Sequence, residues 1–256
     1  MTLQEYYGFP EGTNCTMNYY TIVDFGLDTP INGPIDRLCY SQLNRYALPD
    51  MKNCKPTSMY YAFQLLSNVK TYNGLQYLDT SECTDMTGAL YSLPANDLDY
   101  IRNWDTSNVT SMNAMFQSNN QLIIFDVEWD TSKVKDMQSM FYSCNNLVSI
   151  CALDCSSVEP NKFPFASYMG DNKTLTTLGG FINLKTSQNN SYGLTKLPNL
   201  TYESCINILN GLYDFTGNGE TPNSSQGKLK VNQAFMDKLT EEDLNIAILK
   251  GWQLLV

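Results

Sequence analysis

The sequence predicts an α/β solenoid, a stack of short helices and strands closed by an N-terminal and a C-terminal cap. The phrase "NWDTSNVTSMNAMFQ" at 103–117 returns as "EWDTSKVKDMQSMFY" at 128–142. Each copy is followed by a Leu-containing segment with the alternation typical of a strand. Such repeats indicate one structural unit stacked on the next, because a single unit cannot bury its own apolar side.

The repeat extends to both sides of these two copies. Matching residues recur with a period of about 25 residues, from about residue 51 to about residue 184. One unit has Cys83 at the position of Val109 and Val134, which predicts a small, buried and unpaired side chain. Further matching positions are Met59, Phe63, Val158 and Phe165.

Each unit has two halves with different periodicity. In the first half, Met112, Met115 and Phe116 are spaced i, i+3, i+4, which predicts one apolar face of a short helix. The second half, "NNQLIIFDV" at 119–127, alternates like a strand. A strand and a short helix in every 20 to 29 residues is typical of a leucine-rich repeat. We therefore expect equivalent residues to stack in buried places, with Phe116 over Phe141.

The Trp-Asp-Thr-Ser part of the phrase is expected to have a structural role. Asp105 and Asp130 each precede Thr-Ser, so their carboxylates are placed to accept backbone N–H groups at a turn. This interpretation favours a structural aspartate over a catalytic one. Trp104 and Trp129 are expected to cover the gap between successive units.

Composition narrows the classes of function. The chain of 256 residues has 26 Asp+Glu against 16 Lys+Arg and a formal net charge of -10, which argues against nucleic acid and anionic membranes as partners. No apolar run approaches the ~18 residues that a membrane span needs, so no membrane insertion is expected. The chain has no His, which excludes a His-dependent catalytic triad, and it has no Gly-rich phosphate loop. We predict a non-enzymatic protein without a cofactor.

Cysteine usage predicts no metal site. The 8 Cys residues include no Cys-x-x-Cys pair, and four thiolates from scattered positions would have to meet to bind zinc. Cys83 and Cys144 are expected to be unpaired and mostly buried. A few disulfides remain an alternative if the protein works outside a cell.

The strand pattern predicts one candidate binding surface. In Leu-x-x-apolar-x-apolar, the residues that flank the second apolar position point outward. Stacked units would place them in columns on a concave sheet, where exposed aromatics and Arg favour contact with a partner. The alternative is a solvent-facing sheet with incidental aromatics. The candidates are Tyr77, Tyr100, Ile124, Ser149 and Thr177 in one column, and Asp79, Arg102, Asp126, Cys151 and Gly179 in the next.

Residues 1–48 carry no repeat and are rich in Tyr, Pro and Gly. We predict that they anchor the protein to other structural proteins or to a copy of itself, because aromatic clusters mark interfaces. The alternative is a simple cap over the first unit. The anchoring candidates are Tyr6, Tyr7, Phe9, Tyr19 and Tyr20.

Residues 201–256 are predicted to form an α/β cap on the last unit. Apolar residues spaced i, i+3, i+4, i+7 predict a helix at 202–214, and "KLKV" at 228–231 and the final "WQLLV" predict strands. Between these strands, Thr240 is expected to be the N-cap of a second helix, which ends at Gly251.

The phrase "WDTSNVTSMNAMF…NNQL" closely resembles the BspA-like leucine-rich repeats of bacterial surface proteins, mollicutes and some phages of gut bacteria. The resemblance covers roughly residues 51–200, and the C-terminal part is similar to the end segment of the same family. Residues 1–48 depart from it. The resemblance implies a repeat domain at 49–200 and a role in binding or adhesion.

Together these observations predict a binding or structural module that acts through protein–protein interaction or host attachment. The first hypothesis is a phage virion protein displayed for host attachment or surface decoration, since the N-terminus lacks a signal-peptide pattern. The alternative is a secreted or cell-surface bacterial adhesin whose export signal is absent from this chain. The expected partner is a protein or glycan on a cell surface, and the expected location is the virion or, alternatively, the extracellular space or bacterial surface.

Overall fold

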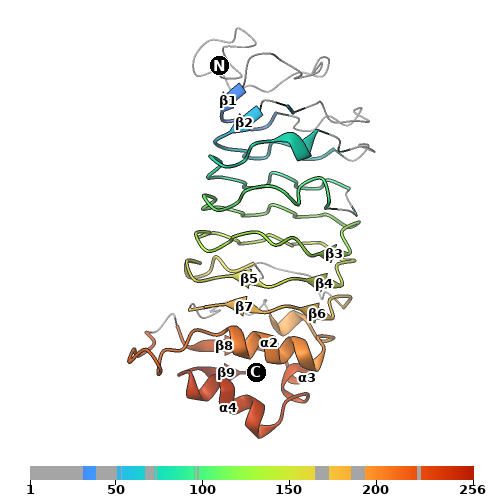
Figure 1. The fold of residues 1–256 in the computed structure, drawn as a ribbon. Coiled ribbons are helices and arrows are strands. Elements are labelled where there is room, and N and C mark those ends of the chain that lie inside the picture. Colours follow the sequence, from blue (N-terminus) through green and yellow to red (C-terminus); the bar gives the residue numbers. More distant parts are fainter. Residues whose placement is uncertain are drawn as a thin grey trace.

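The computed structural model is an elongated stack of chain segments with α-helices at its C-terminal end (Figure 1). The structure describes residues 31–38, 51–52, 54–66, 72, 74–94, 96, 98–164, 173–185, 194–223 and 226–256. The anchoring candidates Tyr6, Tyr7, Phe9, Tyr19 and Tyr20 lie outside the described residues, as do Phe165 and most of 1–48.

Short parallel strands join neighbouring segments of the stack. The described strands form four small sheets, and in three of them each strand pairs with the equivalent segment of the next repeat unit. The pairs are β1 (Ile31–Gly33) with β2 (Cys54–Pro56), β3 (Ile124–Phe125) with β4 (Ser149–Ile150) and β4 with β6 (Thr177–Leu178), β5 (Leu153–Asp154) with β7 (Phe181–Ile182), and, near the C-terminus, β8 (Lys228–Lys230) with β9 (Gln253–Leu255).

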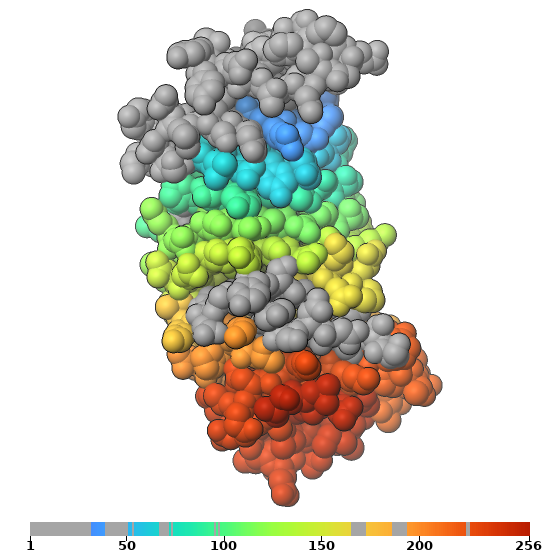
Figure 2. Space-filling model, turned by 180° about the vertical axis from the view of Figure 1, so that it is seen from behind, coloured from blue at the N-terminus to red at the C-terminus, as the bar shows by residue number. Residues whose placement is uncertain are grey.

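Equivalent residues of successive units lie directly over one another, and we call each unit a rung. Isolated parallel bridges run from Ser58 through Asp85 and Ser111 to Asp136. The rings of Phe116 and Phe141 stack with centroids 6.0 Å apart at an angle of 9°, and both are fully buried. This confirms the expected equivalence of the two phrases. The rungs follow one another in sequence order when the molecule is viewed from behind as well (Figure 2).

The first half of each rung is a series of turns and not the predicted helix. The N–H groups of Met112, Ala114 and Phe116 donate to carbonyl oxygens of the next rung at 2.8, 2.9 and 3.0 Å. Between them, the N–H of Met115 donates to the carbonyl of Met112 at 3.2 Å, which closes a local turn. The backbone of Ala114 is left-handed, with φ +54°. The equivalent residues Arg37, Tyr61, Gly88 and Ser139 are left-handed as well.

The predicted α/β leucine-rich-repeat solenoid is therefore wrong. The described part of 51–184 contains no α-helix, only the three-residue 3-10 turn η1 (Leu75–Tyr77), and its strands form small separate sheets without a closed solenoid. An α-helix needs right-handed residues whose N–H groups reach the carbonyl four residues back. A series of turns whose N–H groups donate to the next rung buries the same i, i+3, i+4 positions. Apolar spacing alone therefore did not distinguish a helix from these turns.

The stack begins earlier than the sequence pattern indicates. The N–H groups of Ile35 and Arg37 donate to the carbonyls of Ser58 and Tyr60 at 2.8 and 2.9 Å. Ile35 thus occupies the position that Met59 has in the next rung, and it is fully buried. At least residues 31–38 of the segment at 1–48 therefore pack on the first repeat unit.

A ladder of buried threonines connects the rungs. Thr80, Thr106 and Thr131 are each no more than 2% exposed. The hydroxyl of each threonine donates to the backbone carbonyl of an aspartate in the next rung, at 3.0, 2.9 and 3.0 Å; these aspartates are Asp105, Asp130 and Asp154. Because a buried hydroxyl without a partner is costly, the threonine ladder fixes the register of each rung on the next.

The aspartates and tryptophans of the phrase have the expected structural roles. The carboxylates of Asp105 and Asp130 accept the N–H groups two residues ahead, each at 2.9 Å. Trp104 and Trp129 stack with centroids 6.2 Å apart at 5°, so the pair spans two rungs. The indole N–H of Trp104 also donates to the carbonyl of Leu75 at 2.8 Å.

The described cysteines are unpaired. Cys83 and Cys144 are buried as expected, and burial raises the pKa of both thiols to about 12. Cys83 therefore fills the same apolar position as Val109 and Val134, which are also fully buried. The described free cysteines are Cys54, Cys83, Cys144, Cys151, Cys155 and Cys205.

Most C-terminal elements agree with the sequence, although the helix predicted at 202–214 ends at Gly211 and the short helix at Gln233–Met236 was not predicted. The helices are α2 (Tyr202–Gly211), the short α3 (Gln233–Met236) and α4 (Glu241–Leu249), preceded by the 3-10 turn η2 (Leu194–Lys196). Thr240 caps α4 in a capping box with Asp243, and Gly251 after this helix is left-handed at φ +85°. Helix α2 packs on β6 and β7 at the end of the stack (Figure 1).

Candidate binding surface

The predicted outward column is present where β3, β4 and β6 pair. Ile124, Ser149 and Thr177 are partners in parallel register, while the buried residues beside them, Phe125 and Ile150, face the core. Ile124 is 50% exposed, and Thr177 is also exposed. The pleat explains this arrangement, because neighbouring residues of a strand point to opposite faces.

Three exposed apolar side chains come from the N-terminal ends of β3 and β4. Ile123 and Ile124 are 49% and 50% exposed, and Val148 on the next rung is 37% exposed. The N–H of Val148 donates to the carbonyl of Ile123 at 2.8 Å, so the two residues are neighbours. We call Ile123, Ile124 and Val148 the apolar patch. Sequence reasoning missed Ile123 and Val148, although both are the first x of Leu-x-x-apolar and lie next to the predicted column.

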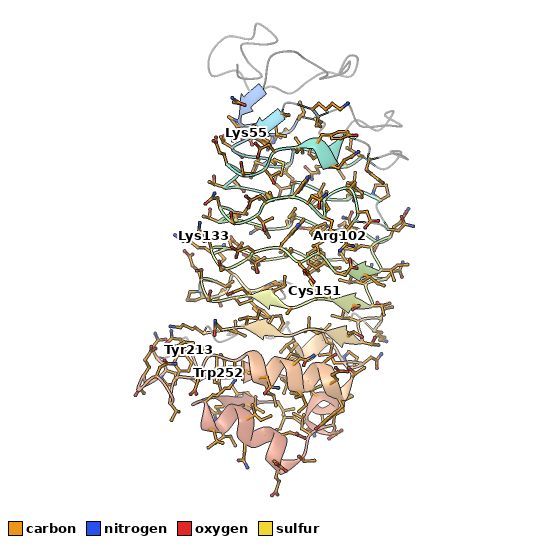
Figure 3. The ribbon with its side chains drawn as sticks, viewed as in Figure 1. Lys55, Arg102, Lys133, Cys151, Tyr213 and Trp252 are labelled. Atoms are coloured by element: carbon orange, nitrogen blue, oxygen red, sulfur yellow. The ribbon has the colours of Figure 1, made fainter. Side chains whose placement is uncertain are left out.

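An ion cluster borders the patch. Arg102 donates from Nη2 to the Asp126 carboxylate and from Nη1 to the Asp126 carbonyl, each at 3.0 Å, and from Nε to Asp99 at 3.2 Å. Both carboxylates raise the pKa of Arg102 above its ordinary value. The cluster joins two neighbouring rungs and carries two negative charges against one positive charge. Figure 3 shows Arg102 and Cys151 on the same side of the ribbon.

The second predicted column is partly out of register. Asp79 accepts the N–H of Ser81 at 3.1 Å, which is the role of Asp105 in its rung, and it pairs with Lys55 at 3.4 Å. Asp79 therefore does not lie beside Arg102. Cys151 does follow Asp126 by one rung, but its thiol is partly buried, which raises its pKa to about 11 and keeps it protonated at neutral pH.

The two tyrosine candidates have different environments. Tyr77 is 48% exposed, and the ammonium of Lys52 lies 5.0 Å from its ring centroid. Tyr100 is half-buried and stacks on Tyr72 with centroids 4.8 Å apart. No strand pairing of the described residues links either tyrosine to Ile124. Gly179, the last candidate of the second column, has no room for a side chain, since an added Cβ would meet the Ala152 backbone.

The side chains on this surface offer apolar contact and hydrogen bonding. They are β-branched apolar side chains, hydroxyls and the guanidinium of Arg102, which is paired with two carboxylates. Of these groups, arginine is enriched at protein interfaces. Among the residues that the structure describes, no group of three or more His, Cys, Asp or Glu side chains is arranged to hold a metal ion. Within the same described ranges, no helix has the length and apolar character that a membrane crossing requires.

Comparison with known proteins relates the repeated part of the chain to one family. Residues 57–177 match the family described as "Mycoplasma protein of unknown function, DUF285". No curated protein and no solved structure was found to match the chain. The matched residues include the whole column from Tyr77 to Thr177. The chain is thus similar to this family over its repeated part.

Proposed function

We propose that this chain is a non-enzymatic binding module that contacts a protein or glycan on a cell surface through the face of β3, β4 and β6. The apolar patch is the observation that carries the proposal. Ile123, Ile124 and Val148 expose 49%, 50% and 37% of their surface on adjoining rungs. Single exposed apolar residues are ordinary, whereas a contiguous group with a polar border is typical of an interaction site.

The rigidity of this face supports the proposal. Ile123, Ile124 and Val148 are β-branched, so their side chains have few rotamers to lose on binding. Their backbone is held by in-register hydrogen bonds, such as those from Val148 to Ile123 and from Cys151 to Phe125, both 2.8 Å. A preformed surface loses little conformational entropy when a partner binds.

The border suggests the chemistry of the partner. The guanidinium of Arg102 is already paired with Asp99 and Asp126, and the three groups together leave an excess negative charge. A partner with an apolar centre and basic or hydroxyl groups around it complements this arrangement. The acidic net charge of the chain points in the same direction.

The resemblance to BspA-like repeats supports a location on an external surface. We place the module on a phage virion first, because phages are among the sources of such repeats and the proposed anchoring residues Tyr6, Tyr7, Phe9, Tyr19 and Tyr20 precede the first described rung in the sequence. The bacterial cell surface is the alternative. Antibody labelling of purified phage particles and of bacterial cells distinguishes these two locations.

Binding of the fluorescently labelled protein to gut and oral bacterial cells tests the proposal. Ile124→Lys and Val148→Lys each place a charge in the patch, and we expect about tenfold weaker binding in flow cytometry. The control is Ile248→Lys, which changes an apolar side chain on α4 that is 59% exposed, somewhat more than Ile124 or Val148. Equal binding by wild type and the two patch variants would refute the proposed surface.

A further inference from the structure

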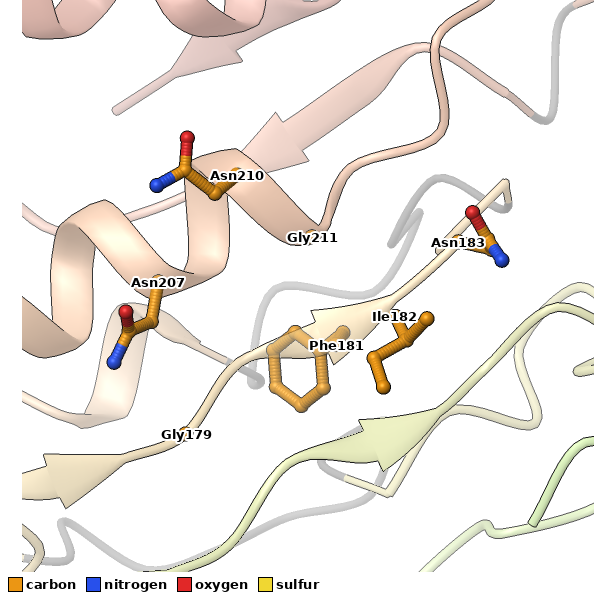
Figure 4. Close-up of a pocket in the computed structure, with 7 residues that line it drawn as sticks. All are labelled: Gly179, Phe181, Ile182, Asn183, Asn207, Asn210 and Gly211. Carbon is orange, nitrogen blue, oxygen red and sulfur yellow. The ribbon is translucent and has the colours of Figure 1, made fainter. Parts of the chain in front are cut away.

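A hollow lies where the last strand of the stack meets helix α2. Its volume is about 310 Å³, and Figure 4 shows β7 on one side and α2 on the other. We call it the Asn hollow. Its lining residues are Gly179, Phe181, Ile182, Asn183, Asn207, Asn210 and Gly211.

Glycines allow the helix and the strand to approach closely beside this space. An added Cβ on Gly180 would lie 2.6 Å from the carbonyl of Asn207, and one on Gly211 would meet the carbonyl of Phe181. Helix α2 therefore packs main chain to main chain on the segment that leads from Gly179 into β7. The open space lies next to this close approach, since Gly179, Phe181 and Gly211 are among its lining residues.

Three carboxamides and no charged groups line the hollow. The side chains of Asn183 and Asn210 have no hydrogen bond to another residue that the structure describes. Asn207 makes one long contact, from Nδ2 to the Leu178 carbonyl at 3.5 Å. Each carboxamide offers both donors and acceptors, which matches hydroxyl groups that also donate and accept.

The hollow also has an apolar side. Ile182 is 46% exposed at the rim, and Phe181 is fully buried beneath it. Asn183 directly follows Ile182 on the β7 side, and Asn207 and Asn210 are on α2 (Figure 4). A ligand for this site therefore needs hydroxyl or amide groups together with an apolar C–H surface. Phosphate, sulfate and carboxylate groups would find no lysine or arginine among the lining residues.

We propose that the Asn hollow binds a single neutral sugar unit, at the end or branch of a glycan. A sugar ring has hydroxyls around its edge and an apolar C–H face, and about 310 Å³ is at the small end of the ~300 to 1,000 Å³ range of ligand sites. This site is separate from the apolar patch and does not depend on the function proposed for that patch. Since no lining group titrates near neutrality, sugar binding is independent of pH between about 5 and 9.

Solution NMR on the full chain tests this site. The probes are glucose, galactose, mannose and N-acetylglucosamine at up to ~50 mM, since Kd values in the millimolar range are ordinary for such small ligands. We expect at least one of them to shift the side-chain amide signals of Asn183, Asn207 and Asn210. Glucuronic acid and inorganic phosphate serve as anionic comparison probes.

Isosteric variants locate the binding. Asn210→Asp and Asn183→Asp keep the size of the side chain but remove the amide donor. Asp also tolerates the left-handed backbone of Asn183, with φ +55°. Each is expected to weaken sugar binding roughly tenfold, whereas the matched control Asn103→Asp on another rung leaves it unchanged. The proposal is overturned if no neutral sugar shifts these signals, if the anionic probes bind more tightly, or if the two variants bind as wild type does.

Discussion

The repeated stack and the C-terminal region satisfy their backbone hydrogen-bonding groups in opposite ways. In the stack, the N–H of Ala114 donates to Gln138, a residue of the next rung, at 2.9 Å. In the C-terminal region, α2 and α4 keep most backbone hydrogen bonds within one helix and bury one side of it. A rung is therefore stabilised by its neighbours, whereas a helix has its own hydrogen bonds before it packs.

The two regions share an apolar spacing. Met112, Met115 and Phe116 lie at i, i+3, i+4, and so do Cys205, Ile208 and Leu209. All six side chains are fully buried. Only α2 has an N-cap, the side chain of Thr201, and a run long enough for several turns. The comparison teaches that apolar spacing indicates which side is buried, while capping residues indicate a helix.

The largest expected effect concerns packing within the stack. Phe116 contacts the rings of Phe125, Trp129 and Phe141 with centroids 5.2 to 6.1 Å away. Phe116→Ala is expected to lower the free energy of unfolding by about 3–5 kcal/mol, because it opens a cavity that crosses rungs. Urea unfolding measures this loss. Hydrogen exchange should rise in the adjacent rungs and stay unchanged in α4, and a uniform rise would contradict the distinction between regions.

A second prediction concerns the threonine ladder. Thr106→Val keeps the shape but removes the donor to the Asp130 carbonyl, so we expect a loss of about 1–3 kcal/mol in urea unfolding. The control is Thr110→Val, whose hydroxyl makes a 3.0 Å bond to Thr84 in an exposed place. The control should change stability by less than about 0.5 kcal/mol. Equal losses would mean that the ladder does not fix the register.

The same substitution should have different effects in the two regions. Ala247→Gly in α4 should cost about 2 kcal/mol, from helix propensity and a lost buried methyl group. Ala114 has a left-handed backbone with φ +54°, which is unfavourable for alanine but not for glycine. In Ala114→Gly this gain offsets the lost methyl group, so the free energy of unfolding should stay within about 0.5 kcal/mol of wild type. Thermal unfolding of both variants measures the difference. Equal destabilisation would favour a helix in the rungs.

The smallest expected effect is a dependence on pH. Hydrogen bonds from Ser107 lower the pKa of Asp105 below its ordinary value. A carboxylate with a lowered folded pKa stabilises the protein above its unfolded pKa of about 3.9, and this contribution is lost as the pH falls below that value. Asp105→Asn should therefore flatten the loss of stability between about pH 5 and pH 2. An unchanged profile of urea midpoints would show that this turn does not contribute.

Sequence reasoning succeeded where signals are local or where spacing is constant. The cap at Thr240 and the end at Gly251 depend on neighbouring residues, so α4 was predicted correctly. The column of Ile124, Ser149 and Thr177 was predicted because each follows a leucine by two residues. The helices predicted in the rungs were wrong because the apolar pattern does not show which carbonyl groups accept the backbone N–H hydrogen bonds.

Other features depend on contacts that no short pattern contains. Asp79 was assigned to the wrong column because its rung has no equivalent of the three residues that separate Ile101 from Asp105. Residues 31–38 share backbone positions with the rungs but not the Met and Phe of the phrase. The Asn hollow arises only where α2 meets β7, so its residues come from distant parts of the chain.

The threonine ladder has a consequence for how such a gene can change. Thr106 and Thr131 offer the same hydroxyl to the next rung, and each meets the carbonyl of an equivalent aspartate 23 or 24 residues ahead. A tandem duplication or deletion of one whole unit by unequal recombination would leave matching partners on both sides of the junction. Each event would lengthen or shorten the molecule by one strand spacing, about 4.8 Å. Length is therefore a trait that this architecture allows to vary in fixed steps, without any new contact having to evolve.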